Sequence, residues 1–362
     1  MIKLYGNHKI YNLLTNASTN NSIASTYLFY GPKGVGKEAV ALKFASFVNQ
    51  IDESMWLNSP NITYIHKTPA SKSTKKAENF YDNYTDDVVD NIKDELSKKQ
   101  ANPYYKMEIA NASQIRIDTI RILRKKLSTS SHGGHRFVIV SDADTMNPAA
   151  ANSFLKTLEE PNPNTTIILI VENINSMLPT ILSRAQKLKF APLTNDELNE
   201  YLIDNYPELT EEKRSIISSF AQGSISNAID FIDQDINQLV EATINLLRAS
   251  LQKTGYRSLL SERVGELTKL RDKNLIITAL KLLQRWLQDA LHLSNGEDKL
   301  IVNISTIDSI KKFANYYDKA NYFNAFESIE QAIVKVNRNV NPDLLLIDLF
   351  LKLRYEFLSS KL

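Results

Sequence analysis

The stretch that most constrains the fold lies between residues 135 and 184, where two apolar runs flank a predicted helix. The runs at 137–140 and 167–171 are short enough for strands that are buried on both faces. Between them, Asn147 suits the cap of a helix and Pro148 its first position, since the N–H that proline lacks has no helical partner there. Strand, helix and strand with short connections indicate parallel strands joined by a crossover. The stretch therefore predicts an α/β fold with a parallel sheet and flanking helices.

A glycine-rich loop occupies residues 31–37, with the sequence GPKGVGK. It follows a short apolar run at 27–30 and precedes a predicted helix over 38–48. Strand, loop and helix in this order suit a phosphate-binding loop, because successive backbone N–H groups and the helix N-terminus form a cradle for anions. The loop is therefore a candidate nucleotide-binding site.

The residues expected to bind nucleotide in this loop are Gly31, Gly34, Gly36 and Lys37. Glu38 follows, at a position where the pattern has a serine or threonine whose hydroxyl binds Mg²⁺. The glutamate side chain is longer, and its charge opposes a bound triphosphate. Two outcomes stay open: binding of ATP or ADP, and a loop that stays empty or holds nucleotide without turnover. No set of metal ligands is predicted.

These features resemble the clamp-loader branch of the AAA+ proteins. Three pieces carry the resemblance by their order and separation: the glycine loop, the helix over 151–161, and the segment 178–184 with the sequence LPTILSR. The resemblance implies an AAA+ core, then a small helical lid and an all-α C-terminal collar through which subunits assemble. It places the core at 1–190, the lid at 191–239 and the collar at 240–362.

A polar stretch at about 67–112 interrupts the predicted core. We interpret its part from Lys67 to Asp94 as a solvated insertion, because the many charged residues there provide little apolar surface to bury. A DNA contact through its lysines is the alternative. Related subunits often carry a four-cysteine zinc module in this region, and the chain has no cysteine, so zinc is not expected.

The resemblance also implies which positions serve ATP hydrolysis. Ser141 replaces the magnesium-binding aspartate of the Walker B strand, and Asp142, one methylene shorter, replaces the glutamate that orients water. Ser226 replaces the sensor arginine of the lid. Hydrolysis depends on positioned charge. These departures, together with Glu38, therefore predict a subunit with little or no ATPase activity of its own.

Ser183 and Arg184, in contrast, follow the family pattern. In the family this pair supplies an arginine finger to the ATP bound by a neighbouring subunit. A guanidinium suits that role because it is always charged and presents several donors to phosphate oxygens. Ala185 stands where the family usually has cysteine, which leaves the arginine itself intact. The alternative is a surface arginine in a salt bridge.

The resemblance as a whole implies a delta-prime-like, non-hydrolysing subunit of the DNA polymerase III clamp loader. The implied partners are gamma/tau-like ATPase subunits and a delta-like subunit, with which the chain would help to load the sliding clamp on primed DNA. The alternatives are an active gamma/tau-type ATPase and a nucleic-acid-binding AAA+ adaptor.

Charge and hydropathy bear on the remaining classes. The formal net charge of +2 gives no support to the nucleic-acid-binding adaptor. The sequence has neither a basic-then-apolar leader nor an apolar run long enough to span a membrane. We therefore expect a cytoplasmic protein without a membrane partner.

Overall fold

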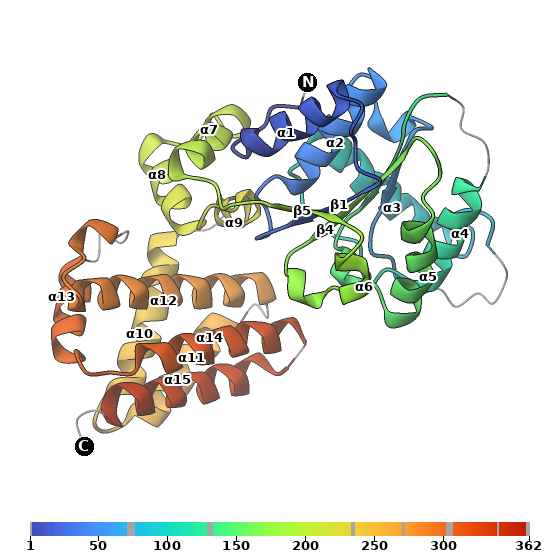
Figure 1. Ribbon diagram of the computed structural model, residues 1–362. Coiled ribbons are helices and arrows are strands. Elements are labelled where there is room, and N and C mark those ends of the chain that lie inside the picture. Colours follow the sequence, from blue (N-terminus) through green and yellow to red (C-terminus); the bar gives the residue numbers. More distant parts are fainter. Residues whose placement is uncertain are drawn as a thin grey trace. The chain divides into compact units, whose positions relative to one another are not determined.

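The structure is a computed structural model, which describes residues 2–70, 77–128, 133–232, 236–269, 272–301, 307–338 and 340–359. The chain divides into two compact units, Met1–Asn227 and Ala228–Leu362. The first unit holds a sheet and its helices, and the second is helical (Figure 1). Each unit is described by itself.

A parallel sheet lies at the centre of the first unit. Its five strands, in chain order, are β1 (Thr26–Tyr30), β2 (Ile62–Ile65), β3 (Arg136–Val140), β4 (Thr165–Val171) and β5 (Gln186–Lys189). They lie in the spatial order β2-β3-β4-β1-β5, and every neighbouring pair is parallel. The predicted α/β fold with a parallel sheet and flanking helices is confirmed. This order places the carboxyl end of β1, which leads into the glycine loop, beside the end of β4.

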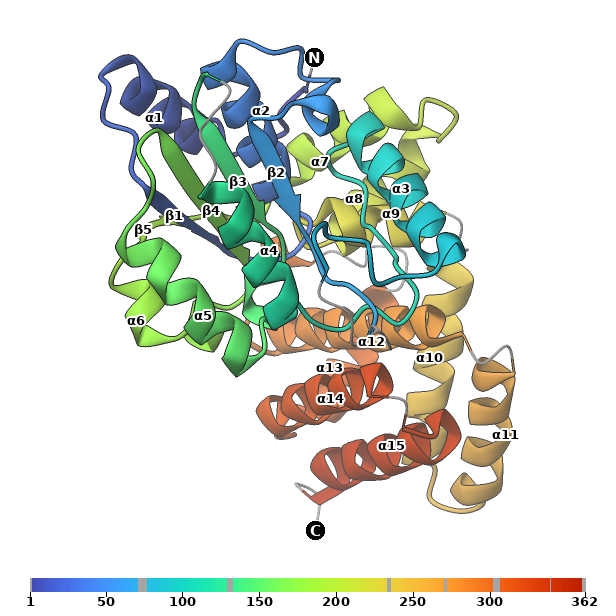
Figure 2. The ribbon, with the colours of Figure 1, turned by 90° about the vertical axis from the view of Figure 1, so that its right-hand side faces the viewer.

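Helices cover both faces of the sheet because its strands are apolar on both sides. Alternate residues of a strand point to opposite faces. Leu28, Val138 and Leu169 belong to the core cluster under α4 (Ile117–Leu127) and α5 (Pro148–Glu159), which lie side by side (Figure 2). On the other face, the ring of Phe137 meets that of Phe44 at 5.4 Å between centroids. Phe44 belongs to α2 (Lys37–Asn49), which packs against α1 (His8–Thr19).

Local capping explains where several helices begin. The Asn147 side chain accepts a hydrogen bond from the Ala150 N–H at 2.8 Å, and Pro148 is the first residue of α5, as predicted. Thr194 and Glu197 form a capping box at the start of α7 (Asn195–Asn205). Apart from α3 (Asp86–Ala101), the remaining helices of the first unit are η1 (Trp56–Asn58), η2 (Ala143–Thr145), η3 (Ile174–Ser176), α6 (Pro179–Leu182), α8 (Glu211–Phe220) and α9 (Ile225–Ile232). The end of α9 lies beyond the boundary between the units.

The polar insertion predicted at about 67–112 contains ordered structure in its second half. This part forms α3 (Asp86–Ala101) and a segment that folds back on it, and it buries charged side chains. The carboxylate of Glu95 accepts hydrogen bonds from the Glu108 N–H at 2.6 Å and from the Tyr105 hydroxyl at 3.0 Å. Charged residues of this part are therefore paired in the interior. Residues 71–76, with the cluster of lysines, lie outside the described residues.

The second unit confirms the predicted helical C-terminal region. Its elements are α10 (Ile236–Leu251), α11 (Tyr256–Thr268), α12 (Lys273–Ser294), η4 (Asp298–Leu300), α13 (Ile307–Tyr316), α14 (Tyr322–Asn337) and α15 (Pro342–Leu358). Helix α12 packs against α10, α13 and α14, and α15 packs against α10, α11 and α14. The buried ring of Trp286 meets that of Phe313 at 4.9 Å. Among the described residues, no helix combines the length and the apolar character needed to cross a bilayer.

Candidate nucleotide site and exposed arginine

A pocket of about 320 Å³ lies beside the glycine loop in the first unit. This volume is at the lower end of the roughly 300–1,000 Å³ of small-molecule sites. The loop, the ends of β2 and β3, the segment after α3 and the start of α9 supply its lining. The predicted site residues that it brings together are Gly34, Gly36, Lys37, Glu38, Ser141, Asp142 and Ser226.

Two glycines allow close packing around the loop. Gly34 has a φ of +70°, and a Cβ there would lie 2.5 Å from the Ser224 hydroxyl oxygen. Gly36 has a φ of +90°, and a Cβ there would lie 3.1 Å from the ring of Tyr104. The Gly34 carbonyl accepts a hydrogen bond from the Ile225 N–H at 2.9 Å. The loop is therefore held between the start of α9 and the segment after α3.

Lys37 is engaged by the loop itself. Its side chain is buried, and its ammonium donates to the carbonyl of Gly31 at 2.6 Å and to that of Pro32. Burial lowers the pKa of Lys37 from 10.5 to about 8. Gly31, which was expected to bind nucleotide, lies outside the pocket lining and contributes this acceptor instead. A phosphate would have to compete with these carbonyls for the lysine.

Glu38 is the centre of a polar cluster whose other members are buried. One carboxylate oxygen accepts hydrogen bonds from the hydroxyls of Ser141 and Tyr64, the latter at 3.0 Å. Burial raises the pKa of Tyr64 well above its usual value, so this hydroxyl remains a donor. The other oxygen forms an ion pair with the ammonium of Lys99, a residue of α3. Sequence analysis did not find Lys99.

These residues do not fit Mg²⁺, the ion that a phosphate-binding loop usually holds. Mg²⁺ demands octahedral coordination by oxygen ligands. Here the oxygens of Glu38 are taken by three donors, and the Ser141 hydroxyl is one of them. The ammonium of Lys99 lies against the same carboxylate and would repel a cation. In the described part of the chain, no group of three or more His, Cys, Asp or Glu side chains is arranged to hold a metal ion.

Asp142 lines the pocket but is committed to a lysine. Its carboxylate lies 2.8 Å from the ammonium of Lys67. Burial would raise the pKa of Asp142, but the charge and hydrogen bond of Lys67 outweigh burial and lower it. Asp142 is therefore an ionised and paired carboxylate rather than one held ready to orient water.

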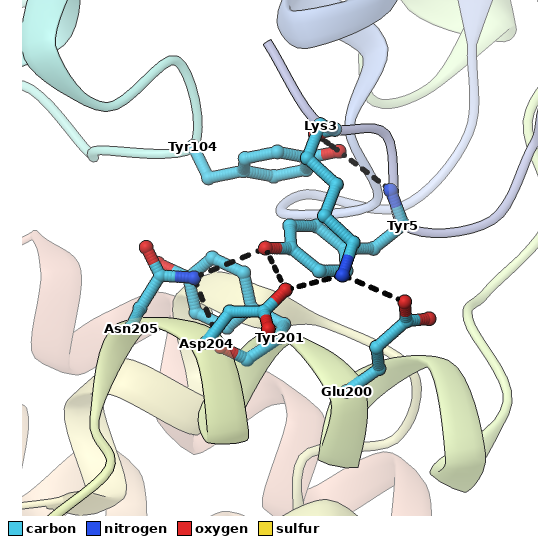
Figure 3. A network of polar contacts seen from close by, with 7 residues as sticks. All are labelled: Lys3, Tyr5, Tyr104, Glu200, Tyr201, Asp204 and Asn205. Atoms are coloured by element: carbon cyan, nitrogen blue, oxygen red, sulfur yellow. Dashed lines mark hydrogen bonds and ion pairs between the residues drawn. The ribbon is translucent and has the colours of Figure 1, made fainter. Parts of the chain in front are cut away.

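A second network of polar and aromatic contacts joins three segments of the first unit, and no sequence motif indicates it. Its members are Lys3, Tyr5, Tyr104, Glu200, Tyr201, Asp204 and Asn205 (Figure 3). The ring of Tyr5 meets the rings of Tyr104 and Tyr201 at 5.5 and 5.1 Å. The Tyr5 N–H donates to the Tyr104 hydroxyl at 3.0 Å, and the Tyr5 hydroxyl donates to Asp204 at 2.8 Å. These contacts connect the N-terminal segment, the segment after α3 and helix α7.

Arg184 follows α6 and does not line the pocket. Its guanidinium forms an ion pair with Glu159 at 2.8 Å and donates to the carbonyl of Thr180, also at 2.8 Å. The Ser183 hydroxyl donates to the same carbonyl at 3.1 Å and accepts from Arg184 at 3.3 Å. The side chains of Arg184 and Glu159 are 35% and 46% exposed. Such an exposed pair contributes about 0–1 kcal/mol, so Arg184 can exchange partners at little cost.

Comparison with known families covers both units. The family described as "DNA polymerase III, delta subunit" matches residues 6–194 of the 362-residue chain. The family described as "DNA polymerase III, delta subunit, C terminal" matches residues 235–354. The first match covers more than half of the chain.

Two relatives are subunits of DNA polymerase III. DNA polymerase III subunit delta' of Bacillus subtilis is 26% identical over 351 residues, which cover 96% of this chain and 95% of that protein. Subunit tau of the same organism is 28% identical over 289 residues, and the match spans 78% of this chain but only 45% of tau. A solved gamma subunit-related protein of Thermotoga maritima is 18% identical, with a TM-score of 0.40, and the match covers 96% of this chain and 98% of that one. The chain belongs to the DNA polymerase III delta-subunit family and is a clamp-loader protein.

Proposed function

We propose that this chain is a delta-prime-like, non-hydrolysing subunit of the DNA polymerase III clamp loader. It acts in the cytoplasm beside gamma/tau-like ATPase subunits and a delta-like subunit, and helps them to load the sliding clamp on primed DNA. The observation that carries the proposal is the cluster around Glu38, where an ion pair with Lys99 stands at the position of a magnesium ligand.

The other groups of the pocket support the same proposal. ATP hydrolysis is catalysed by positioned charges around the phosphates. Lys37 is held by loop carbonyls, and Asp142 is paired with Lys67. Ser226 lines the pocket where the family has a sensor arginine, and its hydroxyl carries no charge. Each of these groups would have to change its partner or its chemistry before the pocket could turn over ATP.

The catalytic contribution of the chain is then Arg184, donated in trans as an arginine finger. Its exposure, its weak pairing with Glu159 and its place outside the chain's own pocket support this role. The guanidinium can form two parallel hydrogen bonds with phosphate oxygens, as it can with a carboxylate. A neighbour's phosphate would replace Glu159 as its partner.

Assembly is assigned to the helical second unit, within the proposed collar at 240–362. Leu344, Leu351 and Tyr355 are exposed on α15, and their spacing of seven and four residues places them on one face of the helix. Exposed apolar groups of this kind mark protein–protein contacts. Leu344→Asp should keep the chain out of the complex in size-exclusion chromatography, whereas Leu13→Asp, at an exposed leucine of α1, should not.

The similarity to tau favours a second candidate, an active gamma/tau-type ATPase. Reconstitution with purified gamma/tau-like and delta-like subunits, the clamp and primed DNA separates the two. The proposal predicts negligible phosphate release by the isolated chain and stimulation of the partners when the chain is added. Robust turnover by the isolated chain that Lys37→Met abolishes would favour the active ATPase instead.

A further inference from the structure

We infer that Lys99 takes the place of the divalent cation in the glycine-loop pocket. Its ammonium neutralises Glu38, excludes Mg²⁺ and makes the pocket insensitive to that ion. The inference deepens the proposed function, which rests on the same Glu38–Lys99 pair, by giving Lys99 the role of the metal ion and α3 the role of positioning it. It concerns the isolated chain.

The cluster occupies the positions at which a loop of this pattern would hold Mg²⁺. In loops of this pattern, the residue after the lysine carries the hydroxyl that ligates Mg²⁺. That residue is Glu38 in this chain, and its partner Ser141 stands at the position of the magnesium-binding aspartate. The side chains at the two positions that would share a metal ion are therefore hydrogen-bonded to each other.

The positive charge at this position is the buried ammonium of Lys99. The Lys99 side chain is 4% exposed, and besides Glu38 its ammonium has the Tyr105 carbonyl as a partner at 2.7 Å. A charge in the interior is very unfavourable unless it is paired and hydrogen-bonded. Glu38 and Lys99 satisfy each other, so a cation that displaced Lys99 would leave a buried ammonium without its counterion.

The other carboxylates of the pocket are also paired with lysines. Three carboxylates line the pocket in the described part of the chain, and each has its own ammonium partner. The pairs are Glu38 with Lys99, Asp142 with Lys67 at 2.8 Å, and Glu108 with Lys106 at 3.3 Å. The two carboxylates that adjoin the loop, Glu38 and Asp142, are therefore already neutralised by lysines, whereas the Glu108–Lys106 pair is exposed and weak.

Helix α3 positions Lys99 against the glycine loop. It lies near the end of α3, one turn after Glu95, which binds the returning segment through the Glu108 N–H. The same segment places Tyr104 against Gly36 of the loop. The Lys99–Glu38 pair is therefore one point of attachment by which α3 and residues 102–109 are held on the glycine loop.

Thermal unfolding of the full-length isolated chain tests this inference, with Lys99→Met, Glu38→Thr and the double variant. Lys93→Met is the matched control, because Lys93 is an exposed lysine of α3 whose ammonium lies 3.5 Å from the carboxylate of Asp90. We expect Lys99→Met to lower the transition of the first unit by on the order of 5 °C or more, since it leaves the partly buried Glu38 carboxylate without its ammonium partner. Lys93→Met should lower it by less than about 1 °C.

The double variant and magnesium supply the decisive comparisons. Glu38→Thr in the Lys99→Met background should recover part of the loss, and this readout remains if Lys99→Met alone does not fold. Exchange of EDTA for millimolar Mg²⁺, with or without ATP, should leave the wild-type transition unchanged. Additive effects of the two substitutions, or a rise in the wild-type transition that requires Mg²⁺ and ATP together, would overturn the inference. Neither result depends on the role of the chain in a clamp loader.

Discussion

The glycine-loop pocket and the Arg184 edge of the first unit hold their charged groups in opposite ways. In the pocket, Lys37 and Glu38 have partners from the same chain, and those partners are buried or belong to the loop backbone. At the edge, Arg184 is partly exposed and pairs with one exposed carboxylate, Glu159. A buried pair is costly to break and an exposed pair is not. The first unit thus keeps the shape of a nucleotide site, whereas the charged group that can readily exchange partners, Arg184, lies outside that site.

The largest effect in this comparison is expected on the pocket side, at Glu95. Glu95→Ala should lower the free energy of unfolding by about 2–4 kcal/mol, because it leaves the Glu108 N–H and the Tyr105 hydroxyl without their buried acceptor. Asp94→Ala is the control, since the neighbouring Asp94 is 61% exposed. Urea unfolding of both variants measures the difference. Equal effects of the two substitutions would show that α3 is not anchored through Glu95.

A smaller effect is expected from the titration of Lys37. The folded chain lowers the pKa of Lys37 to about 8, below the ordinary 10.5, so between these values the unfolded chain retains a proton that the folded chain has lost. Stability then rises with pH through this window. Relative to Lys37→Met, the wild type should gain on the order of 2 kcal/mol between pH 8 and pH 10. Parallel pH profiles of the two proteins would mean that Lys37 titrates normally.

The smallest effect is expected at the edge, from Glu159→Ala. Removal of the exposed partner of Arg184 should change the free energy of unfolding by less than about 1 kcal/mol. The same variant should leave clamp loading unimpaired, because Arg184 would lose a competitor for phosphate. A loss of stability as large as that of Glu95→Ala would remove the contrast between the two regions.

Much of the fold was predictable because its signals are local. Buried parallel strands leave continuous apolar runs, as at 137–140 and 167–171, and caps such as Asn147 act on residues within one turn. The glycine loop can likewise be recognised from seven consecutive residues. These signals placed the sheet, the loop and the start of α5.

The interior of the pocket was not predictable in the same way. Glu38 and Lys99 are far apart in the sequence, and a lysine in a polar stretch carries no sign that it will be buried. The aromatic contacts of Tyr5 with Tyr104 and Tyr201 are equally long-range. One signal was present: a glutamate at the end of a phosphate-binding loop needs a cation, and the lysines of the supposed insertion were candidates for it.

The central claim is that this chain serves a neighbour's nucleotide and not its own. The most direct measurement is the ATPase activity of the reconstituted clamp loader, stimulated by clamp and primed DNA. Complexes would contain the wild type, Arg184→Ala, Lys37→Met or Arg121→Ala, an exposed arginine paired with Asp118 at 3.1 Å, in matched subunit amounts. We predict that Arg184→Ala lowers the rate about threefold or more, well below the ~10³–10⁵ of a sole arginine finger, because other subunits bring their own. Lys37→Met and Arg121→Ala should match the wild type, whereas normal activity of Arg184→Ala together with a loss in Lys37→Met would contradict the claim.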